Sequence, residues 1–276
     1  MSELSIQQLL KTHTVTLRDV ICCGRHRRQS TEECTHATQL VFPYRGVYVR
    51  HLGRSEAVAE ANQVLFFNAT ESYRVSHPVA GGDACLSVAI DEPLLRELVP
   101  REHTRDGTTL AFKEQRRRID ARAQALVALL RHSLIHRAAE TLEAETLTFT
   151  LVRRALNERT SQTPRSTQGR QKLVNRTKLA LSSDVARRWT LAQIAAEVGT
   201  SPVYLTQVFQ QVEGMPLYRY QLRLRLARGL DLLGDCEDLS ALSMELGFSS
   251  HSHFSSAFRQ AYGRTPAEFQ RAANLR

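Results

Sequence analysis

The sequence predicts an α+β protein of two domains, in which an antiparallel β barrel with following helices precedes an all-α domain. Three observations support this prediction. Short β-type segments fill residues 14–90, helical periodicity begins at Glu92, and residues 170–276 show helical patterns alone. The chain has 276 residues, a length typical of about two domains. Its hydrophobic content of 42% is sufficient for buried cores, which argues against a disordered chain.

The N-terminal β region consists of short runs rich in β-branched and aromatic residues. Turn-forming residues, among them Gly46, Asn62, Gly81 and Gly82, separate these runs. Short strands at such spacing are typical of an antiparallel sandwich or a small barrel. The expected strands are residues 15–22, 39–42, 46–49, 63–67 and 85–90.

Helical periodicity from Glu92 continues to the end of the first domain. Leu126, Leu130 and Leu134 recur every four residues, as expected for one face of a helix. The segment 161–169 is polar, contains proline and glycine, and has no apolar pattern, which is typical of a linker. The sequence therefore predicts a first domain over residues 1–160, a linker over 161–169 and a second domain over 170–276.

One helical unit occurs twice in the C-terminal domain. In the first copy, a short helix over residues 191–198 is followed by Gly199, which supplies a turn. Ser201 is placed to cap the next helix, and Pro202 can occupy its first position. Ala195 is small enough for the two helices to cross closely. The pattern predicts a helix-turn-helix unit whose second helix leaves one face free for the major groove of DNA.

The second copy has Gly247 in the place of Gly199, and Ser243 occupies the small crossing position. Either Ser249 or Ser250 is expected to cap its second helix. A helix from Pro216 joins the copies and carries arginines outside its leucine stripe. Two copies are a more specific signal than one, because single amphipathic helix pairs with a glycine turn are common in helical cores.

The charge balance permits a polyanionic partner without establishing one. The chain has 37 Lys+Arg and 28 Asp+Glu, a net charge of +9, and the surplus divides almost evenly between residues 1–165 and 166–276. No apolar run approaches the roughly 18 residues that a membrane span requires, and the N-terminus lacks the pattern of a signal peptide. The five cysteines indicate cytosolic thiols rather than a disulfide framework. We therefore expect a cytoplasmic protein without a membrane partner.

The second copy also carries a family signature. Residues 247–259 (GFSSHSHFSSAFR) and 262–271 (YGRTPAEFQR) resemble the signature of AraC/XylS-type transcription regulators. The resemblance covers residues 172–271, while residues 14–90 resemble, more loosely, the cupin-like sensor barrel of such regulators. It implies two helix-turn-helix units that read successive major-groove turns of double-stranded DNA, and an N-terminal region that senses an effector, dimerises, or both. By the same analogy, the protein is expected to be an activator that works with RNA polymerase.

The resemblance places the base-reading positions on the second helix of each unit. Gln207 and Gln210 offer amide groups suited to adenine edges, and Val203 offers a contact for the thymine methyl group. Neither helix has the arginine often seen at guanine-reading positions in the family, which leaves sequence preference softer or more dependent on DNA shape. The expected base-reading residues are Val203, Thr206, Gln207, Gln210, His251, Ser252, Ser255 and Ser256. The expected phosphate-contacting residues are Arg219, Arg223, Arg259 and Arg264.

Cysteines and histidines near the N-terminus form a second group with possible chemistry. Thiolates and imidazoles are ligands of zinc and other soft metals. The group matches no paired C-x-x-C pattern, and adjacent residues on a strand face opposite sides. Buried thiols and surface histidines are therefore the favoured interpretation, with no metal and no cofactor expected, and oxidation of Cys22 or Cys23 with Cys85 is a less favoured option. The less favoured metal ligands are Cys22, Cys23, His26, Cys34 and His36.

The histidine pattern argues against an enzyme. Cupin enzymes bind metal through two near-adjacent histidines, a carboxylate and a distant histidine. Here His51 stands alone, and His77 is followed by Pro78 with no second histidine nearby, so the pair is expected to shape a turn. The sequence also lacks a phosphate-binding loop and a nucleophile elbow. We therefore expect a barrel that holds a ligand without catalysing a reaction.

Together these features predict a homodimeric, sequence-specific DNA-binding transcription regulator with an unknown small-molecule effector. The apolar residues of the helices after Glu92 are expected either at the dimer interface or against the protein's own barrel. Two alternatives remain. One is a regulator without a small-molecule ligand that a protein partner controls, and the other is a metal- or thiol-responsive sensor that uses Cys22, Cys23 and Cys34.

Overall fold

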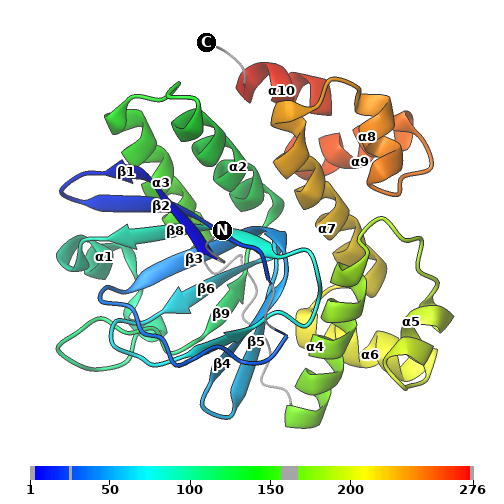
Figure 1. Cartoon of the computed structure of the whole chain (residues 1–276), viewed down its shortest axis with the longest axis horizontal. Helices are drawn as coiled ribbons and strands as arrows, with labels where there is room; N and C mark the ends of the chain where they lie inside the picture. The colour runs from blue at the N-terminus through cyan, green and yellow to red at the C-terminus, as the bar shows by residue number, and fades with distance from the viewer. Residues whose placement is uncertain (1–3, 25–26, 157–166, 274–276) are drawn as a thin grey trace. The chain divides into compact units, whose positions relative to one another are not determined.

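A computed structural model describes residues 4–24, 27–156 and 167–273 (Figure 1). The chain divides into two compact units, and within the described residues the division falls between Leu156 and Thr167. Each unit contains a hydrophobic core of its own. None of the described helices is both long and apolar enough to cross a membrane.

Two antiparallel β-sheets form the centre of the N-terminal unit. The larger sheet has the strand order β1-β2-β8-β3-β6-β9, and the smaller one has the order β5-β4-β7. The strands are β1 (Leu4–Lys11), β2 (Val15–Cys22), β3 (Gln39–Gly46), β4 (Tyr48–Leu52), β5 (Ser55–Ala59), β6 (Gln63–Phe67), β7 (Arg74–Ser76), β8 (Asp83–Ile90) and β9 (Arg116–Arg118).

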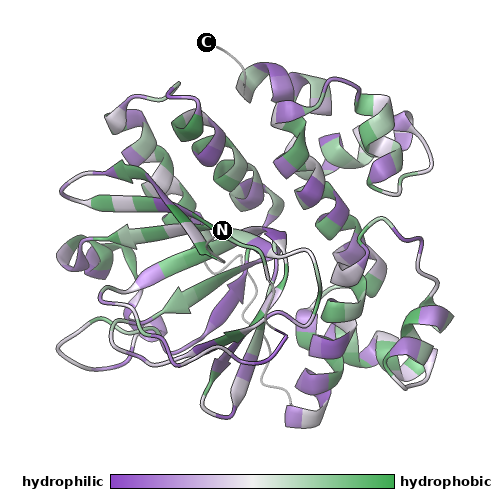
Figure 2. Cartoon of the chain, viewed as in Figure 1, coloured by the Kyte–Doolittle hydropathy of each residue, from purple (hydrophilic) through white to green (hydrophobic). Residues whose placement is uncertain are grey.

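Side chains of the larger sheet alternate between two buried faces. On β3, Leu40 and Phe42 belong to the core shared with the helices, whereas Val41 belongs to a second core between the two sheets. The same period of two separates Phe66 from Phe67 on β6. Because both faces are covered here, consecutive apolar residues are buried, as in residues 40–42 of β3 and 64–67 of β6. Green stretches on the strands in Figure 2 mark such runs.

Three helices cover one face of the larger sheet. They are α1 (Glu92–Leu98), α2 (Ala121–Ile135) and α3 (Thr141–Leu156). Leu130 of α2 and Leu151 of α3 are fully buried. Leu126, Leu134 and Phe149 are partly buried against the same core. Most of the apolar positions considered for a dimer interface therefore pack on the protein's own barrel.

The antiparallel β architecture followed by helices confirms the predicted fold class, and β2, β3, β4, β6 and β8 contain or overlap the expected strands. Four further strands, β1, β5, β7 and β9, were not predicted.

The helical region expected from Glu92 is interrupted, because residues 99–120 contain a short 3-10 helix (η1, Arg101–His103) and β9. Arg117 of β9 is buried and donates hydrogen bonds to the ring of His103 at 2.9 Å and to the Leu156 carbonyl at 3.0 Å. These polar contacts hold the segment extended.

The C-terminal unit contains helices alone. They are α4 (Gln168–Ser183), α5 (Leu191–Glu197), α6 (Pro202–Glu213), α7 (Leu217–Leu232), the 3-10 helix η2 (Leu233–Asp235), α8 (Leu239–Glu245), α9 (His251–Tyr262) and α10 (Pro266–Ala273). Because α4 begins at Gln168, the last two residues of the predicted linker, Gln168 and Gly169, are helical instead. Linker residues 161–166 lie outside the described residues.

Candidate nucleic-acid interface and ligand cavity

Helices α5 and α6 form the first helix-turn-helix unit. Thr190 and Gln193 begin α5 with a reciprocal capping box, in which each side chain accepts a hydrogen bond from the other residue's backbone N–H. Gly199 turns the chain with a φ of 66°. Ser201 then caps α6 by accepting the N–H of Tyr204 at 3.3 Å, and Pro202 occupies the first turn. The local sequence therefore fixes both the turn and the start of α6.

A continuous apolar contact locks this first unit. Ala195 on α5 is 1% exposed, and Leu205 and Phe209 on α6 are completely buried. A buried ion pair also joins α4 to α6: Lys178 of α4 pairs with Glu213 in the last turn of α6, with 2.6 Å between Nζ and Oε1. Both side chains are almost fully buried, and removal of one partner of such a pair leaves an uncompensated charge in the core. These contacts hold α6 against α4 and α5.

Helices α8 and α9 repeat the arrangement. Ser243 is 1% exposed at the crossing of the two helices, and Gly247 supplies the turn with a φ of 79°. Ser250 caps α9 by accepting the N–H of His253 at 3.1 Å. The core of this unit is aromatic, and its ring contacts join Phe248, Phe254, Phe258, Tyr262 and Phe269.

Helix α7 supports both units at once. Near its first turn, Tyr220 packs edge-on against Phe209 of α6, with ring centroids 5.1 Å apart. Near its last turn, a Cβ atom on Gly229 would lie 3.1 Å from a methyl group of Leu246 and 3.3 Å from the ring of Phe254. Glycine at this position therefore permits close packing of α7 against the second unit.

A cavity of about 420 Å³ lies within the N-terminal unit, lined by both sheets. Such a volume is typical of a site for a small molecule. Burial in its wall raises the pKa of Tyr73 to about 12. The wall also includes the apolar side chains of Val41 and Phe67 and the ring of Tyr48. The cavity is therefore largely apolar with a few polar groups, which is the usual composition of a ligand-binding pocket.

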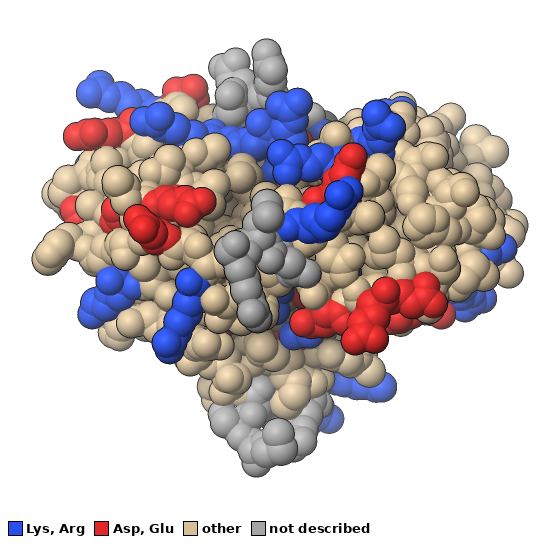
Figure 3. Space-filling view, turned by 90° about the horizontal axis from the view of Figure 1, so that it is seen from above, with Lys and Arg blue, Asp and Glu red and all other residues tan. Residues whose placement is uncertain are grey.

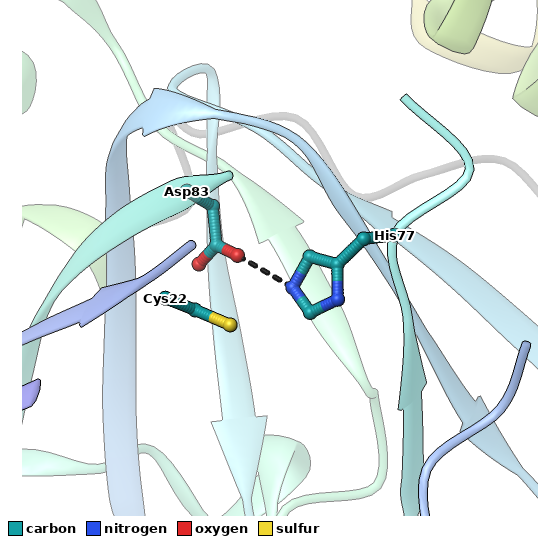
Figure 4. Close-up of side chains that lie close together, drawn as sticks. All are labelled: Cys22, His77 and Asp83. Carbon is teal, nitrogen blue, oxygen red and sulfur yellow. Dashed lines mark hydrogen bonds and ion pairs between the residues drawn. The ribbon is translucent and has the colours of Figure 1, made fainter. Parts of the chain in front are cut away.

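One part of the cavity wall gathers a thiol, an imidazole and a carboxylate (Figure 4). Cys22 ends β2, Asp83 begins β8, and His77 lies on the segment after β7. Their ligand atoms all lie within 4.8 Å of one another, and His77 Nε2 lies 2.7 Å from Asp83 Oδ1. His77 does lie between two strands, where a turn was expected, but its side chain faces the cavity.

The described members of the less favoured metal-ligand set, which was Cys22, Cys23, His26, Cys34 and His36, do not come together as one site. Cys23, Cys34 and His36 are exposed, and His26 lies outside the described residues. Cys22 instead joins His77 and Asp83, which are far from it in sequence. The pairing of β2 with β8 brings Asp83 to Cys22, and His77 contacts Asp83 from the segment after β7.

Comparison with known proteins assigns the C-terminal unit. A sequence model of a helix-turn-helix domain family matches residues 194–272, which include the two glycine turns and both second helices. The C-terminal unit is an AraC-type helix-turn-helix domain.

Similar proteins found by sequence comparison are named as transcriptional regulators. The probable transcriptional regulator LumQ of Photobacterium leiognathi is 28% identical over 161 residues, which cover 55% of this chain and 61% of LumQ. The regulator GadX of an Escherichia coli O6:H1 strain is 32% identical over 91 residues, 33% of each chain. The chain therefore spans less than two thirds of the length of either relative.

A solved structure also matches the AraC-type domain. It is a Chromobacterium violaceum transcriptional regulator described as containing an AraC-type DNA-binding domain, 28% identical, covering 40% of this chain and 98% of that one at a TM-score of 0.37. The sequence matches are what assign the domain.

On α6 of the AraC-type domain, the predicted base-reading residues lie on one helical face, because they recur at intervals of three and four. Val203 is 69% exposed, and Gln207 and Gln210 are also exposed. Thr206 is half-buried, and its hydroxyl donates to the Pro202 carbonyl at 2.9 Å. Tyr204, which the sequence reasoning passed over, is 46% exposed on the same helix.

On α9, His251, Ser252 and Ser256 are exposed and Ser255 is half-buried. His251 Nε2 lies 3.3 Å from Ser255 Oγ, one helical turn away, so the two side chains share a hydrogen bond along the face. The face opposite is the aromatic core. The first two turns of α9 therefore present small hydroxyl groups and two imidazoles, those of His251 and His253, to solvent.

The arginines considered for phosphate contact differ in exposure. Arg219, Arg259 and Arg264 are exposed, whereas Arg223 is half-buried. Desolvation raises the pKa of the Tyr262 hydroxyl, and the charge of Arg223 opposes that rise. On the face drawn in Figure 3, basic and acidic side chains are interspersed. A broad area at the right, within the AraC-type domain, shows no charged side chain. The exposed side chains of Arg219, Arg259 and Arg264 therefore stay the predicted phosphate contacts.

Proposed function

We propose that this protein is a sequence-specific DNA-binding transcription regulator, in which α6 and α9 enter successive turns of the major groove. The repeated unit carries the proposal. Each copy has a glycine turn, a small residue at the helix crossing and a capped second helix. A helix presented in this way fits the major groove with its N-terminal residues toward the base edges.

The N-terminal unit would supply the regulation. Its cavity of about 420 Å³ favours a small effector over control by a protein partner alone. An effector changes DNA binding only if its affinity differs between two states of the protein. A homodimer is part of the proposal, and Leu142 of α3, which is 74% exposed, is an apolar side chain that another protomer would cover. Activation through RNA polymerase rests on analogy with the family.

The base-reading assignment is tested by selection from a library of random-sequence DNA duplexes. The enriched duplex is then used to compare the wild type with Gln207→Ala and His251→Ala. Each variant should lose discrimination at one base position, by about 1–3 kcal/mol for a lost pair of base contacts. Their melting temperatures should match the wild type, because both side chains are exposed.

Gln260→Ala is the matched control. It removes an exposed glutamine from the last turn of α9, away from the N-terminal residues that reach base edges. It should keep the wild-type preference. Unchanged preferences in both Gln207→Ala and His251→Ala would refute the assigned base contacts.

A further inference from the structure

We propose that Cys22, His77 and Asp83 form a binding site for a divalent transition-metal ion of the Zn²⁺ type inside the cavity of the N-terminal unit. The three donors lie within 4.8 Å of one another (Figure 4). The His77 and Asp83 side chains are 9% and 7% exposed, and Cys22 is half-buried. The three side chains therefore line the cavity and are not a cluster on the exposed surface.

The donor set matches the chemistry of zinc. Zn²⁺ takes thiolate sulfur, imidazole nitrogen and carboxylate oxygen at about 2.0–2.3 Å. A thiolate and a carboxylate together neutralise the two charges of the ion, and the thiol proton of Cys22 passes to solvent. Donors of a tetrahedral ion lie about 3.3–3.8 Å apart at these bond lengths. The 2.7 Å contact between His77 and Asp83 would therefore lengthen slightly, and the wider spacings would contract.

Strand pairing holds two of the donors in place. Cys22 and Asp83 are direct partners in the β2–β8 register. Gly82 allows this end of the sheet to close, because a Cβ atom at that position, where φ is 71°, would lie 2.2 Å from the Cys22 carbonyl oxygen. Gly24 also packs closely, because a Cβ atom there would lie 2.7 Å from the Gly82 Cα. The backbone therefore holds the Cys22 sulfur and the Asp83 carboxylate close together without a bound ion.

A neighbouring thiol orients the carboxylate. Cys85 Sγ donates to Asp83 Oδ2 at 3.6 Å, while Oδ1 faces His77. Such outer contacts fix the orientation of a metal ligand.

The cavity leaves room for a further ligand of the ion. All three donors line it, so a fourth position would face the cavity interior, where water or an anionic group of a small molecule could bind. An ion here would join the end of β2, the start of β8 and the segment after β7. The role of the ion as an effector of DNA binding rests on the proposed function, whereas the site itself does not.

The test is a titration of the full chain with Co²⁺ after removal of metal by a chelator, because Co²⁺ occupies zinc sites and reports its ligands in the absorption spectrum. The wild type should bind one equivalent and show a thiolate-to-cobalt charge-transfer band with the visible bands of a tetrahedral ion. Cys22→Ser should lose the charge-transfer band. Its affinity for Zn²⁺ should fall by more than the roughly 10–100-fold that the loss of an outer contact costs.

Cys23→Ser is the matched control, because Cys23 is the adjacent thiol and is exposed. It should retain both the band and the stoichiometry, and His77→Gln should lose the visible bands while circular dichroism stays native. Absence of stoichiometric binding in the wild type would overturn the site, as would retention of the band in Cys22→Ser. DNA binding by the chelator-treated protein is measured separately, so a failure of the metal site and a failure of the proposed function are distinguished.

Discussion

Arginine side chains on neighbouring parts of the AraC-type domain have very different surroundings. Arg225 of α7 donates to the carbonyls of Val185 and Arg187 at 2.9 Å and of Gly247 at 3.2 Å, and desolvation lowers its pKa. It joins the segment after α4 to the turn of the second unit. Arg259 of α9 is exposed. In the sequence both are simply arginines of helices, so only the structure distinguishes Arg225, which binds backbone carbonyls, from the exposed Arg259.

Truncation of these two arginines should have opposite effects. Arg259→Ala should weaken binding to all DNA sequences and reduce the slope of log K against log salt by about 0.9, the contribution of one phosphate contact, with the melting temperature unchanged. Arg225→Ala should instead destabilise the domain, because it removes the hydrogen bonds to the Val185 and Gly247 carbonyls, each of which contributes about 1 kcal/mol. Binding at several salt concentrations and thermal unfolding measure both effects. An unchanged salt slope in Arg259→Ala would remove that residue from the interface.

At the scale of elements, the two glycine turns look equivalent in sequence and differ in packing. Gly199 and Gly247 both have positive φ, at 66° and 79°. A Cβ atom at position 247 would lie 2.0 Å from the Ala186 carbonyl oxygen, whereas no described atom lies within 4 Å of the corresponding point at position 199. The second turn therefore needs glycine for close backbone approach as well as for its φ.

Alanine at each turn should reveal this difference. Gly199→Ala should destabilise the protein by the conformational cost alone, roughly 1–2 kcal/mol. Gly247→Ala should cost clearly more, because the backbone near Ala186 must also move. Urea unfolding of the two variants, followed by helical circular dichroism, provides the comparison. Equal losses in the two variants would show that the contact with Ala186 relaxes freely.

The predictable elements are those whose signals are local. The turn at Gly199, the cap at Ser201 and the crossing residue Ala195 lie within a few residues of one another, so the helix-turn-helix unit could be predicted from the sequence. Strands β5 and β7 are short and lack a clear alternation, and they were missed. The group of Cys22 and Asp83 depends on the register of β2 with β8, which no local pattern encodes.

At the scale of the whole molecule, the two units have separate hydrophobic cores. Phe112 of the N-terminal unit is 1% exposed and stacks on Phe66, with ring centroids 4.1 Å apart. Phe209 of the C-terminal unit is completely buried and contacts Tyr220. A change in one of these cores removes packing from that core alone. The proposed division of the chain into domains near residues 161–169 can therefore be tested by stability measurements.

Differential scanning calorimetry of the full chain should show two unfolding transitions, because each core melts cooperatively on its own. Phe112→Ala should lower one transition and Phe209→Ala the other, since truncation of a buried phenylalanine costs about 3–5 kcal/mol in the unit that contains it. Added Zn²⁺ should raise only the transition that Phe112→Ala lowers, because ligand binding stabilises the unit that holds the site. A single transition that both variants lower equally would mean that the chain unfolds as one cooperative body, and the proposed two-domain division would then be wrong.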